Sequence, residues 1–118
     1  MLLLTGDPEP GSQPDPRSVA AMGRYVKELV GAGVLLAAEG LLPTSTGARI
    51  RFAGGGHSVV DGPFTRSAER IAGTFLIEVR SMAEAVEWAS RCPIAVTLAD
   101  GEEAGVEVRQ AYEIPAAG

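Results

Sequence analysis

One carboxylate offers the clearest chemistry in this sequence. Asp61 stands before Gly62 and Pro63, where glycine lets the backbone come close and proline fixes the chain. A carboxylate held at such a position and partly shielded from water could accept a proton from carbon or oxygen. The alternative is that Asp61 is a turn residue whose side chain accepts backbone N–H bonds. The residue types fit both interpretations, and Asp61 is the predicted catalytic candidate.

Four further side chains are candidates for a substrate pocket around this carboxylate. Phe64 could form an apolar wall, and Arg66 could bind an anionic substrate through its paired donors. Glu39 could face the pocket as a second carboxylate, and Tyr25 could donate a hydrogen bond into it. Each has a structural alternative. An aromatic beside a turn is more often a core anchor, Arg66 could pair with Glu69, a strand-end acid is usually solvated, and helix packing explains a tyrosine equally well.

The other reactive residue types form no recognisable site. His57 is the only histidine and adjoins Gly54–Gly56, so a solvent-exposed loop position is the favoured interpretation. These glycines lack the strand-to-helix context and the lysine of a phosphate loop. Because the chain has one His, one Cys and scattered acids, we expect neither a metal site nor a cofactor.

The totals limit the class of protein. The 118 residues are enough for one domain spanning residues 1–118. Ten Lys and Arg against fifteen Asp and Glu give a net charge of -5, which argues against a nucleic-acid partner. Cys92 is the only cysteine, so a reducing compartment is expected. The apolar run Met1–Leu4 is too short for an export signal or a membrane span, so we predict a cytoplasmic protein without membrane association.

Local patterns predict two amphipathic helices. The first starts at Asp15–Pro16 and ends at Gly31 and Gly33, which supply a left-handed stop. The second starts at a capping box made by Ser81 and Glu84. The apolar stripe of the first helix is expected at Val19, Met22, Val26, Leu29 and Val30.

Strands are expected between and around these helices, at residues 2–5, 34–38, 73–79 and 106–114. The segment 34–38 is apolar at every position, which is typical of a strand covered on both faces. Apolar and arginine residues alternate over 49–52, and a glycine turn then leads to 58–61, which predicts a hairpin with one wet face.

The order of these elements predicts the fold class. Strand, helix, strand, hairpin, strand, helix and strand give an α+β, ferredoxin-like βαββαβ fold with a hairpin extension and an antiparallel sheet carrying both helices on one face. The other face would expose a larger apolar patch than monomers usually tolerate. We therefore predict a homodimer in which two sheets pack face to face and enclose a pocket in each half.

Four segments carry a family resemblance: Val59–Phe64, Gly73–Val79, Ala85–Ala89 and Cys92–Pro93. Together they resemble the DGPF branch of the YCII-related proteins. The resemblance implies a ferredoxin-like protomer and a dimeric α+β barrel. It implies an enzymatic role through analogy with barrel relatives such as muconolactone isomerase and small cofactor-free monooxygenases. It also implies a regulatory setting, because this branch accompanies extracytoplasmic-function sigma factors in many bacteria.

Two departures limit what the resemblance carries over. The broader group has a His near the start of its first helix, paired with an Asp, whereas the helix expected here at 17–32 has no His. Of the acidic, Thr, Lys and Glu residues that follow the motif in relatives, only Glu69 matches.

The functional prediction is a cofactor-independent protein that transfers a proton on, or isomerises, an unidentified and partly apolar small molecule at Asp61. The alternative is a non-catalytic ligand-binding or protein-interaction module, linked to sigma-factor regulation, in which Asp61 is a turn residue.

Overall fold

The computed structural model describes residues 1–6, 15–64, 71–94 and 104–112, which form helices, strands and one short 3-10 helix. No helix among these residues is long and apolar enough to cross a bilayer. In chain order the elements are β1 (Leu2–Thr5), α1 (Pro16–Gly31), β2 (Leu35–Gly40), η1 (Thr44–Thr46), β3 (Ala48–Ala53), β4 (Gly56–Asp61), β5 (Ile71–Ile77), α2 (Met82–Ser90) and β6 (Gly105–Val108).

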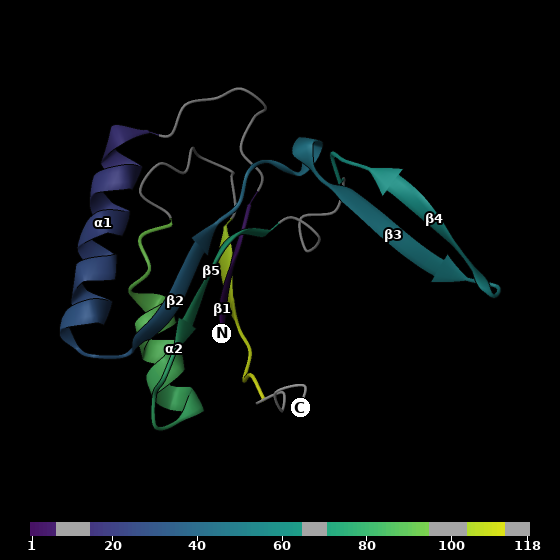
Figure 1. Cartoon of the computed structure of the whole chain (residues 1–118). Coiled ribbons are helices and arrows are strands. Elements are labelled where there is room, and N and C mark those ends of the chain that lie inside the picture. Colours follow the sequence, from purple (N-terminus) through teal and green to yellow (C-terminus); the bar gives the residue numbers. More distant parts are fainter. Residues whose placement is uncertain (7–14, 65–70, 95–103, 113–118) are drawn as a thin grey trace.

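The main sheet has the strand order β2-β5-β1-β6, and each neighbouring pair is antiparallel. Both helices lie on the same side of it (Figure 1), because the buried side chains of α1 and α2 join those of β1 and β5 in one cluster. This order and layering confirm the predicted ferredoxin-like α+β fold. β5 begins earlier than predicted, at Ile71, and β6 ends at Val108, whereas residues 113 and 114 lie outside the described ranges.

The predicted helix starts are confirmed by their caps. The Asp15 carboxylate accepts the Arg17 backbone N–H at 2.8 Å, and hydrogen bonds from Arg17 hold the pKa of Asp15 below its usual value. At α2, Ser81 Oγ accepts the Glu84 N–H at 3.1 Å, and the Glu84 carboxylate accepts the Arg80 N–H at 3.1 Å. These bonds satisfy backbone donors that the first turn of a helix leaves free.

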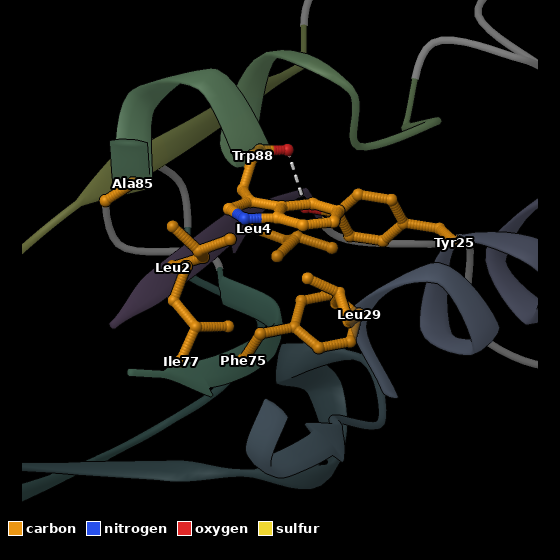
Figure 2. Packing of buried hydrophobic residues seen from close by; sticks show 8 residues of the cluster. All are labelled: Leu2, Leu4, Tyr25, Leu29, Phe75, Ile77, Ala85 and Trp88. Carbon is orange, nitrogen blue, oxygen red and sulfur yellow. Dashed lines mark hydrogen bonds between the residues drawn. The ribbon is translucent and has the colours of Figure 1, made fainter. Parts of the chain in front are cut away.

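The core lies between the helices and the sheet (Figure 2). Leu2 from β1 and Leu29 from α1 are fully buried at its centre. The Tyr25 ring meets Phe75 edge-on, with 5.6 Å between centroids, and its hydroxyl donates to the Trp88 carbonyl at 2.7 Å. This bond joins α1 to α2 across the apolar layer and satisfies the one polar atom that Tyr25 brings into it.

The apolar stripe predicted for α1 is partly wrong. The helix buries Ala21, Tyr25 and Leu29, whereas Val19 and Val30 are 58% and 60% exposed. Residues four apart lie on one helix face, so the observed stripe is centred on Tyr25. This face of α1 contacts Trp88 of α2, and the sequence of α1 alone does not predict that contact.

The hairpin is a separate two-stranded sheet, β3 with β4, closed by Gly54 and Gly55 at φ values of 60° and 79°. Such left-handed conformations suit glycine and are typical of tight hairpin turns. The hairpin projects away from the helices (Figure 1). Instead of one wet face it has two within the single chain, since β4 is exposed at every position. Likewise β2, expected to be covered on both faces, is mostly exposed at the edge of the main sheet.

Candidate functional site

The turn after β4 is fixed by a close approach between two backbone segments. The Gly62 N–H donates to the Gly47 carbonyl at 2.9 Å, which closes the base of the hairpin. A Cβ atom placed on Gly62 would lie 1.7 Å from the Thr44 carbonyl oxygen, so only glycine fits against this backbone. The following bond, Gly62–Pro63, is a cis peptide. The Phe64 N–H donates to Thr44 Oγ1 at 3.1 Å, and Thr44 is buried.

Asp61 is the last residue of β4, and it pairs with Ala48 at the base of the hairpin. Its side chain is exposed, and its carboxylate makes no hydrogen bond or ion pair with the described residues. Because side chains alternate along a strand, Asp61 lies on the same hairpin face as Val59 and its partner Ile50. The arrangement is an unpaired carboxylate at a fixed turn, beside apolar side chains.

Phe64 lies near this carboxylate in sequence and is half-buried. The Arg49 guanidinium carbon sits 4.1 Å above the centre of its ring, within the range of cation–π attraction. Sequence reasoning missed both Thr44 and Arg49 as parts of this turn. Thr44 gives no signal in the sequence, and Arg49 is one of the alternating arginines of the predicted hairpin. Arg66 lies outside the described residues.

Glu39 lies elsewhere, inside β2 rather than after it as expected. It pairs with Thr74 of β5, and Thr74 pairs with Leu3 of β1. Leu3 pairs on its other side with Glu107 of β6. Paired residues share a face, so this row crosses the sheet on the side away from the helices. We call that side the open face. Glu39 is thus exposed on the open face, whereas Asp61 is on the hairpin.

Tyr25 belongs to the core described above, where its hydroxyl points at the Trp88 carbonyl. Burial raises the pKa of this phenol to about 12, so it stays protonated at neutral pH and acts as a hydrogen-bond donor. The structure therefore brings Asp61 and Phe64 together at the hairpin base, and it places Glu39 on the open face and Tyr25 behind the sheet among the helices.

Comparison with protein families gives a match to the YCII-related domain over residues 1–111, nearly the whole chain. The chain belongs to the YCII-related family. An uncharacterized protein of Rhizobium meliloti (strain 1021) is 33% identical over 75 residues, which are 64% of this chain and 60% of the relative. The chain thus spans less than two thirds of the length of that relative.

The described part of this YCII-related chain has an open hollow with a volume of about 720 Å³. It lies where β5 leads into α2, and it is lined in part by Met1, Leu36, Leu76, Met82 and Tyr112. None of the four described candidates for the site lines it. Among residues 1–6, 15–64, 71–94 and 104–112, no group of three His, Cys, Asp or Glu side chains could hold a metal ion.

Proposed function

We infer that this YCII-related chain acts on a small, partly apolar molecule without a cofactor, with Asp61 as the proton acceptor and a second copy closing the pocket. The observation that carries this proposal is the Asp61 carboxylate, which lies on the apolar face of the hairpin without an ion-pair partner among the described residues, next to a turn that Gly62 fixes. A carboxylate without an ion-pair partner takes up protons more readily once apolar side chains replace water around it.

The second copy supplies that enclosure. In one chain Asp61, Ile50 and Val59 all face water, so a ligand bound there would be open to solvent. Packing of two protomers would cover the apolar side chains of the hairpin and of the open face together.

A non-catalytic role is the alternative, and one observation favours it. The contacts of Gly62 and Phe64 with Thr44 explain these residue types as a structural turn. Asp61 would then only end the hairpin in a ligand-binding or protein-interaction module, which could serve a sigma factor.

Solvent deuterium exchange separates the two. A panel of small unsaturated lactones is incubated with the protein in D2O, and proton NMR follows exchange at carbon. The wild type should accelerate exchange over buffer, Asp61→Asn should lose the acceleration with an unchanged urea midpoint, and Glu39→Gln, the other candidate carboxylate, should retain it. Exchange by the wild type at the buffer rate would reject proton transfer on this class. A lowered midpoint for Asp61→Asn with exchange intact would establish the turn role.

A further inference from the structure

The β3–β4 hairpin carries an apolar face that the chain itself does not cover. Ile50, Phe52 and Val59 are 55%, 79% and 62% exposed. Ile50 pairs with Val59 and Phe52 with His57, whose ring centroid is 5.9 Å from that of Phe52, so all four side chains lie on one face. We call this set the arm face.

The hairpin is anchored to the rest of the described chain by hydrogen bonds at its base. The base is closed by the Gly62–Gly47 bond and anchored to η1 by the bond from Phe64 to Thr44. Farther out, β3 and β4 pair with each other in a sheet separate from the main one, and Figure 1 shows them projecting from that main sheet. An isolated two-stranded hairpin is marginally stable in water, and packing of its apolar face is what normally stabilises it. A fixed base with an uncovered apolar face suits an arm that packs on another molecule.

The open face of the main sheet also carries partly exposed apolar side chains, beside its polar row of Glu39, Thr74 and Glu107. Leu3 and Leu76 project from it, since their strand neighbours Leu2 and Phe75 are buried on the helix side. Leu36, at the irregular position of β2, is 57% exposed and borders the same hollow as Leu76.

The exposed apolar side chains can be compared with the area of a protein interface. A standard interface takes roughly 800 Å² from each partner. On the arm face, Phe52 offers on the order of 150 Å², and Ile50 and Val59 together offer roughly the same again. The arm face is therefore too small for a stable dimer by itself, so a dimer that uses it needs a second surface as well.

We propose that the β3–β4 hairpin is an exchanged arm: its arm face packs on the open face of a second copy of this chain, while the partner's arm packs reciprocally on the first. A two-fold dimer covers the arm face and the open face of both protomers. A partner that binds one of these faces would leave the other exposed. The net charge of -5 disfavours an anionic membrane as the occupant. Each Asp61 would then lie at the edge of a contact that the other protomer completes.

Thiol labelling tests where the arm lies. In a Cys92→Ser background, Phe52→Cys probes the arm face, Leu36→Cys the open face, and Val30→Cys the outer side of α1, where Val30 is 60% exposed. Labelling by an uncharged maleimide is timed at low and high protein concentration. As the chains associate, the rates at 52 and 36 should both fall by at least about tenfold. The rate at 30 should not change.

A second pair of variants guards against loss of the hairpin itself. Val59→Thr keeps a β-branched residue in β4, and Val30→Thr makes the same change at a similarly exposed position on α1. Sedimentation equilibrium should show a dimer weakened by about tenfold for Val59→Thr and unchanged for Val30→Thr.

This inference rests on the second copy that the proposed function requires, and the outcomes tell their failures apart. Free labelling at 52 in a dimer would overturn the arm and leave the Asp61 exchange test standing. Protection of the thiol at 52 without protection at 36 would show that the two arms pack on each other. That result would overturn the open face as the surface that binds the arm. A wild type that stays monomeric would overturn both. Protection at both positions with no deuterium exchange would retain the arm and reject the catalysis.

Discussion

Replacing Gly62 with alanine tests the packing at the hairpin base most sharply. The added Cβ would meet the Thr44 carbonyl oxygen at 1.7 Å and its carbon at 2.6 Å, and this backbone cannot swing aside as a flexible side chain would. Gly62 has no positive φ, so the effect comes from the clash and not from a forbidden backbone conformation. The two segments must therefore separate, which would lengthen the bonds from Gly62 to Gly47 and from Phe64 to Thr44.

The magnitude follows from these losses. Forced overpacking costs about 1–3 kcal/mol, and two weakened hydrogen bonds cost about 1 kcal/mol each, so the loss is about 3–5 kcal/mol. If the base of the hairpin opens locally, the loss lowers the free energy of opening of the Gly62 and Phe64 amides, which hydrogen exchange measures. If the base unfolds together with the rest of the domain, the loss lowers the free energy of unfolding measured in urea.

Gly56→Ala is the matched control for this substitution. It lies in the same hairpin, and its added Cβ would come no closer than 4.0 Å to another residue. We expect no comparable loss there. If Gly62→Ala equals Gly56→Ala in both urea midpoint and amide protection, the close approach at Thr44 is refuted.

Three other predictions concern the core and the caps. Ser81→Ala removes the acceptor for the Glu84 N–H and should lower the free energy of unfolding by about 1 kcal/mol in urea; an unchanged midpoint would contradict the cap. Tyr25→Phe removes one of the two donors to the Trp88 carbonyl, which keeps the Arg91 N–H, and should cost about 1 kcal/mol, whereas a neutral result would mean that the bond adds nothing. Burial raises the pKa of Cys92 from 9.0 to about 11 and that of Tyr25 from 10.0 to about 12, so the fold favours their neutral forms. The contribution of these two groups to stability should therefore be constant below pH 9 and fall as the pH rises toward 12, and the Tyr25→Phe, Cys92→Ser double variant should flatten that fall.

Features set by neighbouring residues could be predicted from the sequence. The caps at Asp15 and Ser81 are made by side chains that bond backbone two or three residues away, so residue types alone identify them. The tight turn at Gly54 and Gly55 is equally local. The order of these local elements then determined the fold class, because few topologies accommodate it.

Features set by distant contacts could not be predicted in the same way. Val19 and Val30 fit an apolar stripe as well as Tyr25 does, and only the position of Trp88, 63 residues from Tyr25, decides which face of α1 is buried. The anchor between Thr44 and Phe64 spans 20 residues and joins η1 to the turn after β4. A single sequence gives no signal for such a contact.

The candidate site was predicted in part. The motif residues Asp61 and Phe64 do lie together at one turn, since they are close in the chain, and the sequence indicated that Gly62 allows a close backbone approach. Glu39 was a candidate second carboxylate because it follows the predicted strand 34–38, but β2 continues through it and places it on the open face. The catalytic role of Asp61 remains a prediction.

Sedimentation equilibrium of the unmodified chain at micromolar concentration tests the central claim, that two copies cover each other's apolar surfaces. The account predicts a single species with twice the 12.2 kDa mass of the chain. A well-behaved species of 12.2 kDa would contradict it, because the arm face and the open face would then both be stable in water without a partner.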